Sequence, residues 1–253
     1  MADAKVLVYD IETSPIIGYT WGTWQQDVIK VKEDWQILSV AWKWLGERKV
    51  TVLGQDDFPD YKPGVNNDKS LVEFIHGLFD TADIVIAHNG DSFDQKKCQA
   101  RMIIHGMAPP SPYKQLDTKK IAKRYAAFTS NRLGHLADDL KVAQKGSPGG
   151  FDTWLGCMAG DPKAWAKMKK YNKQDIPPLE DIYIKLRPWI SNHPGINILK
   201  DRPNACPKCG QGPLQARGYT TTKTGKKQRF QCQKCWGWSQ GRTLIKSLNT
   251  YVN

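Results

Sequence analysis

The sequence contains no apolar run long enough to span a membrane. Its first ten residues, MADAKVLVYD, lack the charged and apolar regions of a secretory signal and lead directly into a strand-like pattern. No internal repeat is present. From these absences we expect a protein without a membrane partner that is located in the cytoplasm.

Cysteine is scarce, with six residues in 253. Four of them form two C-x-x-C pairs, while Cys98 and Cys157 stand alone and are expected to behave as small apolar residues. Without a secretory signal, paired cysteines at this spacing indicate metal ligation rather than disulfide bonds. The cysteines therefore predict a metal site and a reducing compartment.

Acidic residues are almost missing from the last 54 positions. Residues 200–253 contain eleven Lys and Arg but one acid, Asp201, whereas the preceding 199 residues contain 26 basic and 24 acidic residues. The net charge of +12 is thus concentrated in a basic tail. Such a tail favours a polyanion partner, most often nucleic acid, and a tail that only improves solubility is the alternative.

The rest of the composition is that of a globular protein, and its length allows one α/β domain with a small appendage. The pattern predicts three early strands, then alternating helices and strands, which is a mixed α/β sheet flanked by helices. The Trp-rich segment 15–34 has no clear period, and we expect a loop there. The predicted strands are KVLVYDIET, QILSVAWKWL, KVTVLG and DIVIAH, with helices at 69–82, 93–106, after Asp117, at 133–140 and from Asp161.

Acidic residues recur where these elements begin or end. Asp10 and Glu12 are two residues apart on a strand and therefore point to one face. Asp94 begins a helix that follows a buried strand, and Tyr171 and Asp175 share one face of a later helix. Carboxylates that converge need cations, and hard oxygen ligands suit Mg²⁺ or Mn²⁺. The pattern predicts a site for two such ions, as in enzymes that cleave phosphodiesters.

The motifs D-I-E-T, N-x-x-x-F-D and Y-x-x-x-D, in this order, resemble the DEDD superfamily of 3′–5′ exonucleases, over about residues 4–190. This family has a ribonuclease H-like fold and includes the proofreading domains of DNA polymerases and stand-alone phage exonucleases. No His lies between His135 and His193, so Tyr171 resembles the tyrosine branch of the family.

The resemblance implies a role for each residue of the motifs. Asp10, Glu12 and Asp175 would hold the metal ion that carries the nucleophilic water, and Asp10 with Asp94 would hold the second. Tyr171 would orient the water, because a phenol is a poor base at neutral pH.

Several neighbouring residues have two interpretations each. Asp91 is an alternative to Asp94 as the ligand, although the motif register favours Asp94. Asn89 either binds the terminal nucleotide or caps a helix, and Phe93 either packs or lies near the substrate. Asp117 is more typical of a helix cap than of a ligand.

Two further features stay open at this stage. Lys145 and the stretch Ser130–Leu133 could contact single-stranded DNA, or could be a solvated lysine and a core leucine. Pro177 and Pro178 follow Asp175, and we expect them to break or kink the helix there.

The tail contains CPKC and CQKC, with Cys206, Cys209, Cys232 and Cys235 as ligands for one structural Zn²⁺. The segment between the pairs predicts a hairpin with its turn near Gly225, which resembles a zinc ribbon. Four basic residues of this hairpin are expected to bind the substrate backbone, and docking to a protein is the alternative. They are Lys223, Lys226, Lys227 and Arg229.

The sequence thus predicts a ribonuclease H-like domain at 1–192, a linker at 193–203 and a basic zinc ribbon at 204–253. The resemblance implies a two-metal 3′–5′ exonuclease that acts on DNA rather than RNA, in replication or repair, with a replication or recombination protein as a possible partner. If the chain is phage-encoded, its location would be the host cytoplasm. An endonucleolytic or structure-specific nuclease and a non-catalytic DNA-binding or recruitment protein are the alternatives.

Overall fold

The computed structural model describes residues 4–24, 27–65, 67–144, 150–222, 225–244 and 246–247. The chain forms two compact units. The larger unit consists of Lys5–Lys120 and Phe128–Ile182, and the smaller unit of Met1–Ala4, Ile121–Ala127 and Tyr183–Asn253. No helix among the described residues combines the length and the apolar character needed to cross a membrane.

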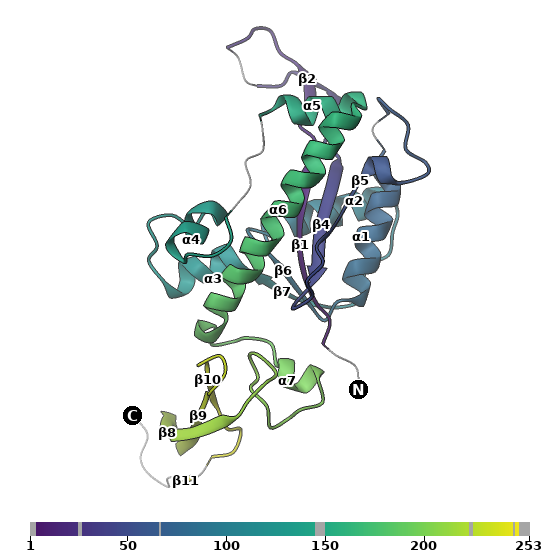
Figure 1. The fold of residues 1–253 in the computed structure, drawn as a ribbon. Helices are drawn as coiled ribbons and strands as arrows, with labels where there is room; N and C mark the ends of the chain where they lie inside the picture. The colour runs from purple at the N-terminus through teal and green to yellow at the C-terminus, as the bar shows by residue number, and fades with distance from the viewer. Residues whose placement is uncertain are drawn as a thin grey trace. The chain divides into compact units, whose positions relative to one another are not determined.

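The larger unit is built on a five-stranded mixed sheet with β1 (Val6–Thr13) at its centre (Figure 1). The strand pairs antiparallel with β4 (Ile37–Trp44) and parallel with β6 (Ile84–Ala87). The edges are β5 (Thr51–Gly54) and β7 (Lys114–Asp117), which gives the order β5-β4-β1-β6-β7. Helices flank this sheet, which confirms the predicted fold class.

One face of the sheet packs on α1 (Lys69–Thr81) and α2 (Asp94–Ile104). Leu7, Tyr9 and Ile11 of β1 are buried in this core, as expected for alternate residues of one strand. The ring of Tyr9 meets that of Phe79 edge-on, with 5.1 Å between the ring centroids. The intervening residues of β1 therefore point to the opposite face, and these include Asp10 and Glu12.

Helix α6 (Pro162–Leu186) covers that opposite face, where Leu38 packs with Trp165 and Met168. The expectation that Pro177 and Pro178 break the helix is wrong, because α6 continues through both. Prolines remove backbone donors, but contacts on both sides of them hold the helix. Ile176 and Leu179 are buried, and Glu180 accepts hydrogen bonds from Lys43 Nζ and from the Gly46 backbone.

Other differences from the sequence predictions are local. The Trp-rich segment forms a hairpin of two short strands, and the short elements that were not predicted include one strand and one helix. The hairpin consists of β2 (Ile17–Tyr19) and β3 (Lys30–Glu33), and these two unpredicted elements are β7 and α5 (Asp152–Ala159). The remaining elements of the larger unit are η1 (Gln55–Asp57), α4 (Leu133–Asp139) and the first three residues of α3 (Thr118–Tyr125), whose other residues belong to the smaller unit.

Asp68 precedes α1, but its side chain makes no capping hydrogen bond. It is fully buried and accepts hydrogen bonds from the Ile37 backbone, from Nε and Nη2 of Arg101 and from Nε2 of His105. This buried carboxylate thereby joins β4, α1 and α2.

The smaller unit contains a four-stranded antiparallel sheet with β9 (Gly225–Cys232) between its partners. The pairing of β8 (Leu214–Thr222) with β9 confirms the predicted hairpin, whose turn at 223–224 lies outside the described residues. The predicted linker contains the short helix α7 (Ile196–Leu199), and Ile196 is buried. The other elements of this unit are β10 (Trp238–Gln240), β11 (Lys246–Ser247) and η2 (Arg187–Trp189).

Candidate metal centres

Two carboxylates from β1 and one from α6 form an acidic cluster in the larger unit. Asp10 and Glu12 project from the same face of β1, and α6 brings Asp175 to that face. One carboxylate oxygen from each residue lies within 4.8 Å of the other two. Ionised carboxylates at this spacing repel one another unless a cation lies between them. The structure therefore brings together three of the four predicted carboxylates in one tight group.

Asn172 holds Asp10 in place from α6. Its side chain is fully buried, and its amide nitrogen donates to Asp10 Oδ2 over 2.7 Å. Its amide oxygen accepts a hydrogen bond of 3.0 Å from Ser39 Oγ on β4. The amide oxygen and the amide nitrogen of Asn172 are thus both held by hydrogen bonds. The hydrogen bond from the nitrogen orients the Asp10 carboxylate.

The sequence analysis missed Asn172 and Ser39. Asn172 lies three residues before Asp175, which places it on the same helix face as the ligand. Ser39 is the β4 residue that pairs with Glu12 across the sheet. The helical spacing could have indicated Asn172, whereas the contact with Ser39 depends on the folded chain.

Asp94, the fourth predicted carboxylate, lies in the first turn of α2 and is buried. The backbone N–H of Ile11 on β1 donates to its Oδ1 over 3.3 Å, so Asp94 is joined to the strand that carries Asp10 and Glu12. Burial raises the pKa of Asp94 to about 7, although the hydrogen bond from Ile11 opposes this effect. A cation close to this carboxyl would favour its charged form.

Asp91, the alternative to Asp94, has a different environment. Its carboxylate accepts a hydrogen bond of 2.7 Å from Lys120 Nζ, and its backbone N–H donates to Asp117. Asp91 therefore forms a lysine ion pair on a loop, whereas Asp94 contacts β1 directly. The choice of Asp94 over Asp91 as a metal ligand stays a prediction.

Tyr171 is buried on α6 one turn before Asp175, as the motif requires. Its ring meets Trp154 of α5 at an angle of 64°, with 6.1 Å between centroids. Trp154 in turn lines a cleft of about 440 Å³ that reaches the residues directly after Glu12. This cleft is lined by Thr13, Ser14, Pro15, Gly150, Phe151 and Trp154.

Asn89 follows β6 and has a left-handed backbone with φ of 69°. Its N–H donates to Asp117 Oδ1 over 3.0 Å, and its side-chain oxygen accepts from Lys119 Nζ over 3.2 Å. Asp117 also accepts the backbone N–H groups of Lys119 and Lys120 at the start of α3. Asp117 is therefore a helix cap, as expected, and it fixes the loop that contains Asn89.

Phe93 lies at the N-terminal boundary of α2, and its side chain is 37% exposed. Lys97 Nζ lies 5.2 Å from the centroid of its ring. Phe93 is not among the buried core residues, although most of its surface is covered. An aromatic side chain next to Asp94 is partly accessible from solvent.

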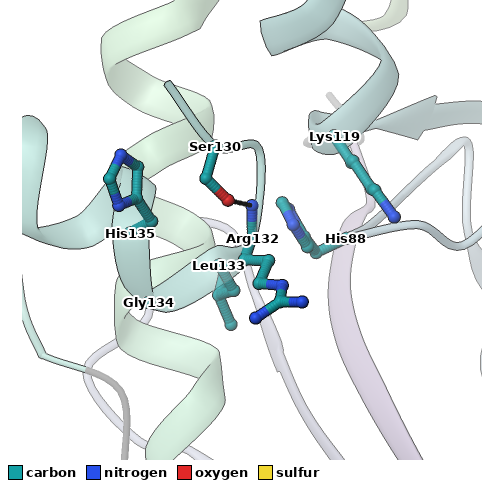
Figure 2. A pocket seen from close by; sticks show the side chains of 7 residues that line it. All are labelled: His88, Lys119, Ser130, Arg132, Leu133, Gly134 and His135. Carbon is teal, nitrogen blue, oxygen red and sulfur yellow. Dashed lines mark hydrogen bonds between the residues drawn. The ribbon is translucent and has the colours of Figure 1, made fainter. Parts of the chain in front are cut away.

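A basic pocket of about 640 Å³ opens beside His88, the residue before Asn89 (Figure 2). The two imidazole nitrogens of His88 lie 2.9 Å from Thr118 Oγ1 and from the Asn131 carbonyl oxygen. Figure 2 shows the Arg132 guanidinium on one side of His88 and the Lys119 side chain on the other. Ser130 lines the pocket and accepts a hydrogen bond from the Arg132 backbone, while Leu133 is buried. Lys145 lies outside the described residues.

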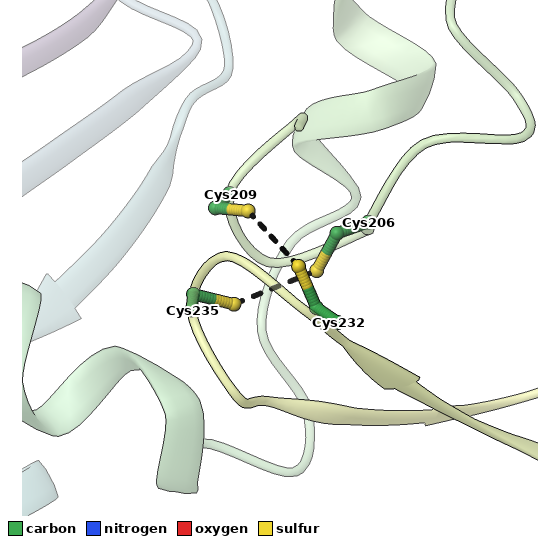
Figure 3. Close-up of side chains that lie close together, drawn as sticks. All are labelled: Cys206, Cys209, Cys232 and Cys235. Atoms are coloured by element: carbon green, nitrogen blue, oxygen red, sulfur yellow. Dashed lines mark hydrogen bonds between the residues drawn. The ribbon is translucent and has the colours of Figure 1, made fainter. Parts of the chain in front are cut away.

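The smaller unit contains a cluster of four cysteines (Figure 3). The Sγ atoms of Cys206 and Cys235 are 3.7 Å apart, and those of Cys209 and Cys232 are 3.8 Å apart. These distances exclude disulfide bonds, which are about 2.05 Å long. Four thiolates at zinc–sulfur distances of about 2.3 Å in a tetrahedron would be about 3.8 Å apart.

Each C-x-x-C pair forms a tight turn that closes with a left-handed residue. Gly210 has φ of 66° and donates its N–H to Cys206 O, and Trp236 has φ of 62° and donates to Cys232 O. A hydrogen bond from Cys209, with backbone N–H groups, lowers the pKa of Cys206, whereas the same hydrogen bond raises the pKa of Cys209 and burial raises that of Cys235. The four sulfurs form a preformed cage that fits a small zinc ribbon.

The basic residues predicted to bind substrate lie on β9, except Lys223, which is outside the described residues. Lys227 pairs with Thr220 of β8, and Arg229 pairs with Gln240 of β10. Because side chains alternate along a strand, Lys227 and Arg229 share one face and Lys226 lies on the other. The structure therefore divides the predicted basic set between two faces.

The donor atoms of the two clusters fit different metals. Carboxylate oxygens of Asp10, Glu12 and Asp175 suit a hard divalent cation such as Mg²⁺ or Mn²⁺. Four cysteine sulfurs suit Zn²⁺ and leave no open position for zinc catalysis. Both clusters fit the metals that the sequence predicts.

A family model for the RNase H superfamily matches residues 49–187, which is more than half of the chain. The matched region includes Asp94, Tyr171 and Asp175, and it begins after Asp10 and Glu12. No curated protein matches the chain. The chain belongs to the RNase H superfamily, which indicates a nuclease that acts on a nucleic-acid substrate.

Proposed function

We propose that this protein is a metal-dependent 3′–5′ exonuclease that shortens DNA from its 3′ end. The observation that carries the proposal is the tight group formed by Asp10, Glu12 and Asp175. Asp94 on α2 and Tyr171 on α6 complete the motif order of the DEDD tyrosine branch. Superfamily membership supports the nuclease class, and the motif order supports the exonuclease mode.

In this proposal Asp10, Glu12 and Asp175 hold one divalent cation, and Asp10 with Asp94 holds a second. When bound, these cations activate a water molecule and stabilise the charge of the leaving oxygen. Asn172 orients Asp10, since its amide donates to Oδ2 of that carboxylate. Tyr171 would orient this water through its hydroxyl, and its buried ring contacts Trp154.

The substrate strand is proposed to reach the acidic cluster of Asp10, Glu12 and Asp175 along the loop that follows β6. Asn89 and Phe93 lie on this loop, with His88, Lys119 and Arg132 around the pocket beside it. A basic pocket favours the phosphate backbone, and an exposed ring favours a nucleobase. DNA is preferred to RNA through the resemblance to proofreading domains.

The C-terminal segment 204–253 is proposed to be a zinc ribbon that helps to hold the substrate, after a nuclease domain at 1–192. Its four cysteines support one structural Zn²⁺, and its nine Lys and Arg residues support a polyanion partner. A setting in replication or repair and a cytoplasmic location stay predictions.

The test is cleavage of end-labelled single- and double-stranded DNA and RNA oligonucleotides with Mg²⁺ or Mn²⁺. We expect a ladder that shortens from the 3′ end of DNA, abolished by chelator and reduced at least about 1,000-fold by Asp10→Asn. Asp91→Asn is the matched control, because it removes a carboxylate from the neighbouring loop and should retain most activity.

Other patterns of cleavage would contradict the proposal in distinct ways. Internal cuts that need the same carboxylates would keep the metal site but overturn the exonuclease mode. No cleavage of any substrate by folded, metal-loaded protein that still binds DNA would indicate a non-catalytic binding protein. A ladder on RNA alone would overturn the choice of DNA.

A further inference from the structure

A second cleft lies within the smaller unit, on the ribbon sheet. It has a volume of about 470 Å³, which is in the range of small-ligand sites. Its walls come from β8, β9 and β10 and from residues near the first zinc knuckle. The lining residues are Ser191, His193, Pro207, Lys208, Thr220, Arg229, Trp238, Ser239 and Gln240.

The register of the sheet explains why these side chains meet. Arg229 pairs with Gln240, Trp238 pairs with Gln231, and Thr220 pairs with Lys227. Directly paired residues point to the same face of a sheet. Trp238, Gln240, Arg229 and Thr220 therefore share the face that forms the cleft, together with Lys227.

Arg229 and Trp238 form a cation–π pair, with 5.4 Å between the guanidinium carbon and the ring centroid. Gly218 makes room for this arrangement, because a Cβ at that position would lie 3.3 Å from Arg229 Nη2. The Trp238 side chain is still 44% exposed, so part of the indole is open to another molecule.

Lys208 supplies a second cation from the knuckle itself. Its side chain is buried, and its Nζ donates to the Pro188 carbonyl oxygen. Gly237 leaves space for it, since a Cβ there would lie 2.8 Å from Lys208 Cδ. Among the described residues that line the cleft, none is acidic. The cleft thus combines two fixed cations, hydroxyl and amide groups and one accessible aromatic ring.

We propose that this cleft binds a nucleotide of single-stranded nucleic acid, with the base on Trp238 and the phosphate near Arg229 and Lys208. Aromatic stacking tolerates every base, and the cations suit the backbone, so the site needs no particular sequence. An acidic protein segment would satisfy the cations but not the exposed ring. The inference rests on the proposed function for the claim that the bound strand is the enzyme's substrate.

The experiment measures binding of a fluorescent oligo(dT) by the full chain carrying Asp10→Asn, so that cleavage does not interfere. Trp238→Leu should weaken binding by about 5- to 150-fold, the range for loss of one stacked base. Arg229→Gln should weaken it by about 3- to 10-fold. An abasic strand of equal length should respond to Arg229→Gln but not to Trp238→Leu.

Matched controls lie in the same unit but do not line the cleft. Tyr219→Leu removes an exposed aromatic ring from β8, and Lys234→Gln removes one charge from the exposed turn of the second zinc knuckle. Both should change affinity by less than about twofold. Zinc content and circular dichroism confirm that each variant is folded.

If the lysine control weakens binding as much as Arg229→Gln, or the tyrosine control as much as Trp238→Leu, the proposed binding site is wrong. Such a result would indicate nonspecific attraction between the basic unit and the strand. Competition by poly-aspartate as effective as by oligo(dT) would instead indicate an acidic protein partner. If wild-type protein cleaves nothing while the binding pattern holds, the cleft is retained and the nuclease proposal fails. If cleavage is normal and the binding pattern is absent, only the cleft proposal fails.

Discussion

At the residue scale, Asn172 contacts the acidic cluster of Asp10, Glu12 and Asp175 without being one of its carboxylates. It is fully buried and joins Asp10 Oδ2 to Ser39 Oγ. We expect Asn172→Ala to lower metal affinity or activity by about 10- to 100-fold, as is usual for residues that orient ligands. Titration of cleavage rate against Mn²⁺ concentration measures this effect.

The control for Asn172 is Gln174→Ala, an exposed change two residues further along α6 that should leave the Mn²⁺ titration unchanged. A purely structural role for Asn172 would lower the melting temperature without moving the Mn²⁺ midpoint. Asn172→Asp adds a charge beside Asp10, and we expect it to be at least as damaging as the alanine change.

His193 provides a pH prediction in the smaller unit. Burial, with the nearby charges of Arg187 and Lys208, lowers the pKa of His193 to about 4, although its bond to the Pro194 carbonyl opposes the shift. An ordinary histidine titrates near pH 6.5. As the pH falls, the imidazole of His193 is therefore protonated in the unfolded chain at a higher pH than in the folded chain. The neutral, buried imidazole thus contributes folding stability that is fully present above pH 6.5 and is lost as the pH falls toward 4.

The pH prediction is checked by following the His193 ring proton by NMR and by urea unfolding between pH 7 and 5. We expect the imidazole to stay neutral through this range and unfolding stability to fall by at most about 1.4 kcal/mol per pH unit. His193→Gln should make the unfolding stability less dependent on pH, whereas His76→Gln, on α1, should leave the pH dependence unchanged. A wild-type midpoint near 6.5 would contradict the structure.

At the element scale, the zinc knuckles and the buried thiols should react differently. Burial raises the pKa of Cys98 well above its usual value and that of Cys157 to about 12, and both side chains are almost inaccessible. Without metal, the ribbon cysteines have no comparable protection, because so small a unit depends on its metal to fold. We expect iodoacetamide to modify four cysteines after chelation and none of the six before it.

Mass spectrometry of the alkylated protein identifies the cysteines that react. Cys209→Ser should lose zinc and expose the remaining three ribbon thiols without chelator. Early modification of Cys98 or Cys157 would mean that the core of the larger unit opens readily, contrary to its complete burial.

The two prolines in α6 should lower the free energy of unfolding relative to alanine at the same positions. Each removes a helix donor, and a helix-interior proline costs about 3 kcal/mol relative to alanine. Pro177→Ala should therefore raise the free energy of unfolding by about 1 to 3 kcal/mol, measured with urea. Pro162→Ala is the control, because proline at the first helical position costs little. Destabilisation by Pro177→Ala would show that the backbone there cannot accept a regular turn.

At the scale of the whole molecule, the sequence predicts most of the architecture and the three carboxylates that meet. Strong apolar patterns mark β1, β4, β6 and α1, whose cores are buried as expected. The missed strand β7 reads KQLD, which is short and polar, so only its pairing with β6 makes it a strand.

Other features depend on tertiary contacts that no local pattern encodes. The continuity of α6 past Pro177 depends on packing and on the Lys43–Glu180 ion pair, whose members are far apart in sequence. The side chain of Asp68 binds Arg101 instead of capping α1 because the fold places that cation beside it. The positions of Asp10 and Asp175 were predictable from motifs, whereas the role of Asn172 required its contacts.

The uneven charge of the molecule leads to the last prediction. The net charge is +12, and most of it lies in the last 54 residues, so phosphate contacts of the smaller unit should dominate the salt dependence of binding. Each such contact contributes about 0.7 to the slope of log affinity against log salt for a single strand. We expect the double variant Lys227→Gln and Arg229→Gln to reduce the magnitude of the slope by about 1.4. The matched control, Arg48→Gln with Lys49→Gln, removes the same charge from the turn between β4 and β5 and should leave the slope unchanged. Equal changes in both would show that net charge, rather than one face of the ribbon, attracts the strand.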